Sequence, residues 1–176
     1  PADLGYVFGP ADLGADSIRN GFGEDQISEY LLNIPTIFRM AILDTCHAGR
    51  EVEHVKDLLA TVSTGKRLGI SILSAAKTTQ VAVDNYKGNG LFTYVLAQGL
   101  KGEADYNDDH IVDSMEIAQY VQETVGQVSR LETLSVQDAV VLPEPRTHIG
   151  RRFELTRLDT EAPPTFRPNI FTPRES

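Results

Sequence analysis

The sequence predicts an α/β fold with a mostly parallel central sheet flanked by helices. Two short apolar runs without helical period, residues 38–43 and 69–73, are typical of buried strands. Segments 24–34 and 113–128 carry apolar residues at helical spacing. Strands that alternate with helices favour a parallel sheet, because a helix returns the chain to the end at which the previous strand began.

The first helix is predicted over residues 24–34 and ends before Pro35. Its apolar residues fall at helical positions i, i+3, i+4 and i+7, which predicts one buried face formed by Ile27, Tyr30, Leu31 and Ile34. The strand over residues 38–43, FRMAIL, follows this helix and ends at Asp44. We expect this strand to be buried in the sheet.

The remaining elements follow in the order that an α/β fold requires. A second amphipathic segment covers residues 52–62, and a helix over 91–100 is predicted to end near Gly102. For the helix over 113–128, Asp113 with Glu116 three residues later forms a capping-box pattern. Its predicted buried face consists of Ile117, Tyr120, Val121, Val125 and Val128.

Residues 1–157 are predicted to form one domain, which accords with the 176-residue length. Residues 158–176 contain four prolines and are predicted to form an extended, proline-rich tail. The sequence opens without methionine on PADLGYVFGP, so we expect the chain to be a fragment or processed product that lacks the N-terminal part of its domain.

The composition excludes several classes of function. A formal net charge of −9, with no run of lysine and arginine, disfavours a nucleic-acid or anionic-lipid partner. The single cysteine cannot form an internal disulfide, and no apolar stretch approaches the roughly 18 residues that span a bilayer. We therefore predict a soluble, cytoplasmic protein without a membrane partner.

That single cysteine, Cys46, lies two residues beyond Asp44, where the predicted strand ends, in the stretch AILDTCHAGR. In an α/β sheet, chemistry takes place beyond the carboxyl ends of the strands. Cys46 could thus be a nucleophile, with Gly49 allowing a tight turn whose backbone amides face a developing oxyanion. The alternative is a buried packing residue, since free cysteines often act as small apolar groups.

The run ILDTCHAG resembles the nucleophile motif of the caspase-like cysteine peptidases, and it is especially similar to the Asp-Ser-Cys-His-Ser-Gly form of metacaspases and bacterial relatives. The resemblance covers about residues 12–127. It includes GEDQISEYLL before the motif, and ISILSAAKTTQVAVDN, GNGLFTYVLAQGLKGEAD and DYNDDHIVD after it. The resemblance implies a caspase-like fold and peptide-bond hydrolysis by a Cys/His dyad, with Cys46 as the nucleophile.

The dyad histidine of that family lies upstream, in a His-Gly motif at the end of a strand. Here all four histidines follow Cys46, and none stands in such a motif. His47 is badly placed as a substitute, because adjacent residues of an extended segment point to opposite sides. We therefore expect the missing N-terminal part of the same domain to supply the histidine, and this chain alone to be inactive. A catalytically inactive binding or scaffold domain is the alternative.

The resemblance places Asp44 in the pocket for the substrate residue before the scissile bond. Caspases that cut after aspartate supply an arginine after the next strand, whereas this chain has Asp84 near that place and no arginine between Gly69 and Gly90. A desolvated cation needs an opposite charge nearby. Asp44 and Asp84 therefore predict cleavage after arginine or lysine.

The expected chemistry requires no cofactor, but calcium is a candidate regulator. Five residues match an EF-hand loop in spacing: Asp105, Asn107, Asp109, Asp113 and Glu116. The glycine position of such a loop is occupied by His110, and an acidic turn that caps the following helix is the favoured interpretation. The resemblance adds a second, weaker calcium candidate, formed by Asp12, Glu24, Asp25 and Glu53. No metal site is assigned.

Overall fold

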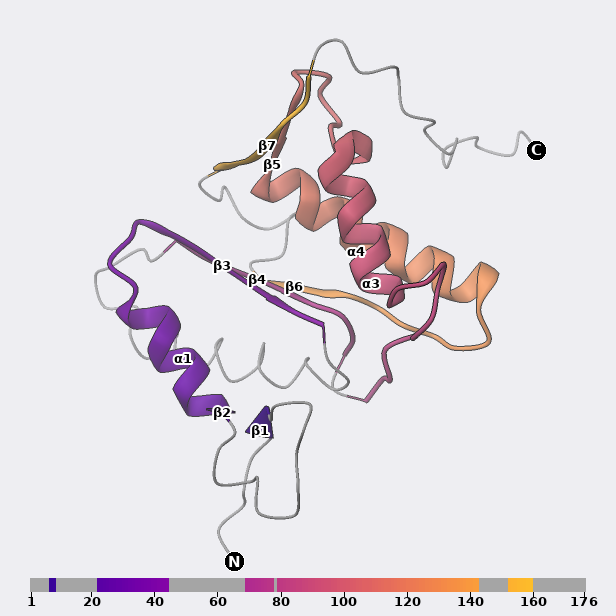
Figure 1. Cartoon of the computed structure of the whole chain (residues 1–176), viewed down its shortest axis with the longest axis horizontal. Helices are drawn as coiled ribbons and strands as arrows, with labels where there is room; N and C mark the ends of the chain where they lie inside the picture. The colour runs from indigo at the N-terminus through magenta and orange to yellow at the C-terminus, as the bar shows by residue number, and fades with distance from the viewer. Residues whose placement is uncertain (1–6, 9–21, 45–68, 78, 143–151, 160–176) are drawn as a thin grey trace, which may run out of the picture.

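The computed structural model describes residues 7–8, 22–44, 69–77, 79–142 and 152–159. In chain order the elements are β1 Val7–Phe8, β2 Phe22–Gly23, α1 Glu24–Asn33, β3 Phe38–Leu43, β4 Gly69–Ser74, α3 Leu91–Gln98, the π-helical turn η2 Gly99–Glu103, β5 Ile111–Asp113, α4 Ser114–Glu132, β6 Val140–Leu142 and β7 Glu154–Arg157 (Figure 1). The predicted mixture of helices and strands is confirmed. The amphipathic segment 52–62 and residues 160–176 of the predicted tail lie outside the described residues.

The central sheet has the strand order β3-β4-β6. β3 and β4 are parallel, with Phe38 opposite Gly69 and Leu43 opposite Ser74. β6 is antiparallel to β4, and the pairs β1-β2 and β5-β7 are also antiparallel. The prediction of a mostly parallel sheet is therefore not confirmed for the described strands. Two helices, α3 and α4, lie between β4 and β6 in the chain, so β6 begins at the end of the sheet where β4 finishes and runs in the opposite direction.

The main core lies between this sheet and the helices α3 and α4, which occupy one side of the strands in Figure 1. Leu73 and Val141 contribute from the sheet, and Leu91 and Phe92 contribute from α3. The predicted inner face of α4 is confirmed, since four of its five apolar residues are buried and Val128 packs against them. Among the described helices, none is both long and apolar enough to cross a membrane.

The predicted burial of the first helix is wrong in part. α1 has nearly the expected bounds, and Leu31 is buried, but Tyr30 and Ile34 are 62% and 43% exposed. The side chain of Ile27 lies outside the described residues. Figure 1 shows α1 on the side of the sheet opposite α3 and α4, away from the main core. Helical periodicity identified an apolar face but not whether anything covers it.

The strand β3 is also less buried than predicted, whereas β4 is buried as expected. Ile42 is 48% exposed, while Ile72 and Leu73 of β4 are fully buried. Within the described sheet β3 is an edge strand with a partner on one side only. An edge strand receives less cover than a central one, and an apolar run in the sequence does not distinguish the two.

The turn at the end of α3 matches its predicted position. Gly102 has a φ of 120°, a conformation that favours glycine, and it lies inside η2, one residue before its end. Leu158 packs against the same glycine, and its backbone N–H donates to the carbonyl of His110 at 2.8 Å. This contact fastens the segment after β7 to the turn that precedes β5.

Candidate active site

The candidate site lies where β3 and β4 end. The backbone N–H of Ala75 donates to the carbonyl of Leu43 at 2.9 Å, so the parallel pairing continues one residue beyond β4. Asp44 is the next residue after β3 and is exposed. Cys46 and His47, two and three residues further on, lie outside the described residues. The described part of the site therefore consists of Asp44 and the residues that contact it.

Asp44 is held by the first turn of α3. The hydroxyl of Thr93 donates a hydrogen bond to Oδ2 of Asp44, across 49 positions of sequence. The backbone of Gly90, the N-cap residue of α3, lies against the same carboxylate: a Cβ atom at Gly90 would be 3.3 Å from Oδ2. The amino end of a helix also favours a nearby negative charge. The end of β3 and the start of α3 thus form one wall of the site.

The segment between β4 and α3 brings the neighbour of Asp84 to this wall. The N–H of Leu91 donates to the carbonyl of Val83 at 2.9 Å. That carbonyl oxygen lies 3.8 Å from the same Cβ position at Gly90 that is 3.3 Å from Asp44. Asp84, the residue after Val83, is exposed. The structure therefore brings the backbone next to Asp84 close to Asp44, while Asp84 itself faces solvent.

A tight turn follows Asp84 and leads into α3. The N–H of Asn89 donates to the carbonyl of Tyr86 at 3.0 Å, and the two central residues have positive φ: 49° at Lys87 and 84° at Gly88. These values are typical of a type I′ turn. The stretch GNG at 88–90 thus allows the chain to turn into the helix.

The segment 75–83 is fastened to the residues before β6. Asp138 accepts hydrogen bonds from Lys77 Nζ and Gln80 Nε2, both at 3.0 Å, and from the guanidinium of Arg130. The N–H of Asp138 in turn donates to the side-chain carbonyl of Gln80 at 2.8 Å. Burial alone raises the pKa of the Asp138 carboxyl, but the hydrogen bonds from Gln80, Arg130 and Lys77 outweigh it and lower the pKa to about 2.

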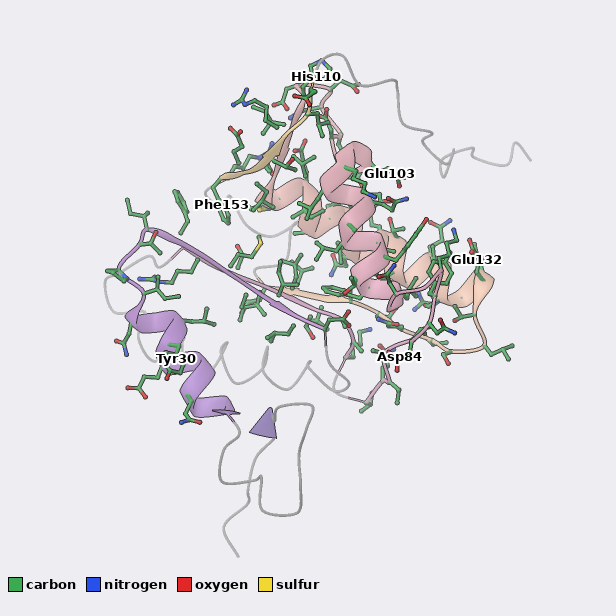
Figure 2. All side chains as sticks on the ribbon, in the orientation of Figure 1. Tyr30, Asp84, Glu103, His110, Glu132 and Phe153 are labelled. Carbon is green, nitrogen blue, oxygen red and sulfur yellow. The ribbon has the colours of Figure 1, made fainter. Side chains whose placement is uncertain are left out.

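His110 is the one histidine among the described residues, and it lies far from this site. It occupies an exposed position in the turn before β5. Figure 2 shows His110 beyond one end of α3 and Asp84 near the other end, well apart from each other. His110 is therefore no partner for a nucleophile at the end of β3.

The acidic segment 105–116 is organised as a turn that caps α4. Asp113 accepts from the N–H groups of Met115 and Glu116 at 2.7 and 2.9 Å, and Glu116 accepts from the N–H of Asp113 at 3.0 Å. The predicted capping box is confirmed. Burial and the nearby carboxylates raise the pKa of Glu116, which the hydrogen bond from Asp113 opposes in part.

Two further acids of this segment also accept hydrogen bonds from backbone N–H groups. Asp105 accepts from the N–H groups of Asp109 and His110, and Asp109 accepts from that of Ile111. Across the described ranges, no group of three or more His, Cys, Asp or Glu side chains is arranged to hold a metal ion. Of the second calcium candidate, Asp12 and Glu53 and the side chains of Glu24 and Asp25 lie outside the description.

A separate cleft of about 610 Å³ lies between the Tyr86 turn, α3, η2 and α4. The rings of Tyr86 and Tyr94 meet edge to face at 5.3 Å, and the ammonium of Lys87 lies 5.1 and 4.9 Å from their centroids. The hydroxyl of Tyr86 donates to Glu132 at 2.6 Å. Neither Asp44 nor Asp84 lines this cleft.

The sequence alone does not point to Thr93 or Gly90 as neighbours of Asp44. Each meets Asp44 across tens of positions, and neither stands in a pattern that carries chemistry by itself. The nearest signal in the sequence is Gly90, because a glycine pair such as GNG at 88–90 is typical of a turn or of a close backbone approach.

Comparison with known proteins identifies the family. The model of the caspase domain, whose members are typically cysteine peptidases that act on proteins, matches residues 6–142. That range contains Asp44, Cys46, Asp84 and Thr93. No curated protein and no solved structure gives a significant match. Because the matched range covers well over half of the sequence, the chain belongs to the caspase domain family.

Proposed function

We propose that the intact protein is a cysteine endopeptidase in which Cys46 attacks the carbonyl of a peptide bond. The observation that carries the proposal is the caspase-domain match over a range in which Cys46 is the third residue after the carboxyl end of β3. Side chains beyond such an end project from a rigid base. The thiolate is the attacking form, and backbone amides of the turn after Cys46 are proposed to stabilise the oxyanion.

The general base and acid is proposed to be a histidine from the N-terminal part of the same domain, outside this chain. All four histidines of the chain follow Cys46. The outer edge of β3 is a suitable place for that part to bind: within the described residues β3 pairs on one side only, and Ile37 and Ile42 are exposed. In addition, Nη1 of the buried Arg39 has no hydrogen-bond partner in the described region.

Cleavage is proposed to follow arginine or lysine, as the resemblance to metacaspases implies. Asp44 supplies the main negative charge, and its anchoring by Thr93 and Gly90 supports this role. Asp84 is proposed to contribute a second charge, since its neighbour Val83 lies against Gly90. Two carboxylates favour a cationic side chain, and neither would favour an aspartate.

A set of fluorogenic peptides ending in arginine, lysine or aspartate tests the proposal on the intact protein. We expect turnover of the two basic peptides, and Cys46→Ala should abolish it. Asp44→Asn should lower kcat/KM for the arginine peptide on the order of 100-fold. Asp84→Asn should have a smaller effect. Turnover of the aspartate peptide without turnover of the arginine peptide would overturn the proposed specificity.

A catalytically inactive binding or scaffold domain is the second candidate. It is favoured by one observation, the lack of a His-Gly motif before Cys46 in this sequence. The two candidates are separated by reading the residues encoded upstream of Pro1 for such a motif after an apolar strand. If the motif is found and the arginine peptide is cleaved, the inactive-domain proposal is wrong.

The proposed chemistry needs no cofactor, because a thiolate and an imidazole supply both nucleophile and proton transfer. Calcium as a regulator stays a prediction of the sequence. The carboxylates of segment 105–116 serve as acceptors for backbone N–H groups in the described structure. A cytoplasmic location and protein substrates complete the proposal, and the net charge of −9 disfavours a nucleic-acid partner.

A further inference from the structure

We propose that Thr93 is a positioning residue that fixes the Asp44 carboxylate for recognition of a cationic substrate side chain. The inference rests on the proposed function of Asp44. Its basis is a contact that neither the family match nor the sequence motifs assign: the Thr93 hydroxyl donates to Asp44 Oδ2 from the first turn of α3.

The contact joins two exposed side chains on different elements. Asp44 lies beyond the end of β3, where a free carboxylate would sample several rotamers. The hydroxyl of Thr93 binds one oxygen, and the backbone of Gly90 limits the space around the same atom. Together the two contacts narrow the range of positions open to the carboxylate.

The bond leaves Asp44 able to bind a substrate. An ionised carboxylate has about four acceptor sites, of which the Thr93 hydroxyl uses one. A guanidinium can therefore still bind in a bidentate manner, which requires both oxygens to be held in a defined plane. Fixing that plane before binding removes an ordering cost from recognition, so the effect of Thr93 should fall on substrate affinity.

The position of Thr93 allows its hydroxyl group to be removed with little other change to the protein. The residue lies in the first turn of α3 and is exposed, and valine matches threonine in shape and in helix propensity. Thr93→Val thus removes the hydroxyl alone, and Thr93→Ser restores a hydroxyl. Thr156→Val serves as the matched control, because Thr156 lies in β7, which belongs to a different sheet.

Two measurements on the intact protein are compared across these variants and Asp44→Asn. The first is KM and kcat for the arginine peptide. The second is the Kd of benzamidine, a small amidinium that probes the pocket without catalysis. For Thr93→Val we expect KM and the benzamidine Kd to rise about tenfold, with kcat within about twofold of the original. Thr93→Ser should recover most of the affinity, and Thr156→Val should change neither value.

The outcomes separate this inference from the proposed function. If Asp44→Asn weakens benzamidine binding and Thr93→Val does not, Thr93 has no positioning role and the inference is overturned, while the proposed pocket for a basic side chain stands. If the benzamidine Kd values follow the expected order across the variants but no peptide is cleaved, the role of Thr93 is supported and the peptidase proposal is contradicted. If the original protein binds no benzamidine and cleaves no arginine peptide, both are wrong. A fall in kcat alone, which Thr93→Ser does not restore, would also overturn the inference.

Discussion

Gln137 and Val83 are joined by a hydrogen bond of 2.7 Å, from the backbone N–H of Val83 to the side-chain oxygen of Gln137. The amide nitrogen of the same side chain donates to the carbonyl of Ala75 at 2.8 Å. Gln137 is fully buried, so one side chain satisfies two backbone groups at opposite ends of the segment 75–83. Because Asp84 follows Val83 directly, Gln137 holds the backbone from which Asp84 projects.

Replacing Gln137 by leucine should therefore destabilise the protein. The change leaves two backbone groups without their partner, and each buried unsatisfied group costs about 1 to 3 kcal/mol. We expect the free energy of unfolding to fall by about 2 to 4 kcal/mol, measured by urea denaturation. Gln119→Leu, on the exposed side of α4, is the control and should change the midpoint little. Equal midpoints for the two variants would contradict the role of Gln137.

Asp138 predicts a specific dependence of stability on pH. Its pKa is lowered from the ordinary 3.8 of an aspartate carboxyl to about 2 in the folded state. A lowered folded-state pKa stabilises the protein above the unfolded value, and this contribution is lost as pH falls through the folded one. The stabilisation, on the order of 2 kcal/mol, should thus be complete above about pH 4 and disappear towards pH 2.

The difference in unfolding free energy between the original protein and Asp138→Asn isolates this carboxyl. Chemical denaturation at pH 6 and at pH 3 should give a smaller difference at the lower pH. The control is Glu154→Gln, whose carboxylate forms an exposed pair with Arg157. A difference for Asp138→Asn that stays constant between the two pH values would be inconsistent with the lowered pKa.

Alanine at Gly90 and alanine at Gly88 should affect different properties: the first should raise KM, and the second should lower stability. Gly90 has an ordinary φ of −66°, so alanine is tolerated by the backbone, but its Cβ would lie 3.3 Å from Asp44 Oδ2. We expect Gly90→Ala to displace the carboxylate and raise KM for the arginine peptide several-fold. Gly88 has a φ of 84° and open space around it. Gly88→Ala should cost about 1 kcal/mol of stability and leave KM unchanged.

Peptide kinetics and urea denaturation on both variants check this pair. An unchanged KM for Gly90→Ala, in a protein that cleaves the arginine peptide, would show that the wall at Gly90 does not determine the position of Asp44.

Gly99 allows η2 to lie close to α4. A Cβ atom there would be 2.5 Å from Ile117 Cδ1 and 2.8 Å from Tyr120 Cδ1, both in the buried core. Gly99→Ala should therefore force a shift in packing and lower the free energy of unfolding by about 1 to 3 kcal/mol. At Gly126 the nearest atom is Nη1 of Arg130, the end of a flexible and half-exposed side chain. Gly126→Ala should change stability by less than about 1 kcal/mol, and calorimetric Tm values compare the two.

The sequence was most informative where a pattern is local. The helix over 113–128 could be predicted together with its cap and its inner face, because the pairing of Asp113 with Glu116 and the spacing of Ile117, Val121 and Val125 are decided within one element. The strand 38–43 could be placed for the same reason. Prediction was weaker wherever two distant elements decide the outcome.

Two features that the sequence did not predict illustrate this: the exposure of Tyr30 and the antiparallel orientation of β6 relative to β4. Periodicity shows that one side of α1 is apolar, but only the tertiary arrangement determines whether that side is covered. The direction of β6 depends on how many helices separate it from β4. The anchoring of Asp44 is a third case: the partner hydroxyl belongs to a residue 49 positions away, and no spacing rule connects a strand end with a helix that comes that much later.

The cap of α4 provides a test of the acidic segment and of calcium together. Asp113→Ala removes the acceptor for two N–H groups, so we expect a loss of about 1 kcal/mol in calcium-free buffer. Glu116→Gln should cost less, because glutamine can still accept from the N–H of Asp113 and so keeps the capping box. Glutamine cannot, however, act as the bidentate carboxylate that an EF-hand loop requires at this position.

The Tm of the original protein and of Glu116→Gln is then measured with a chelator and with millimolar calcium. If calcium regulates through segment 105–116, it should raise the Tm of the original protein, since a ligand that binds only the folded state stabilises it. The rise should be absent in Glu116→Gln, whose helix cap is intact. Identical Tm values with chelator and with calcium would leave Asp113 and Glu116 as a helix cap alone and would contradict the calcium interpretation of this segment.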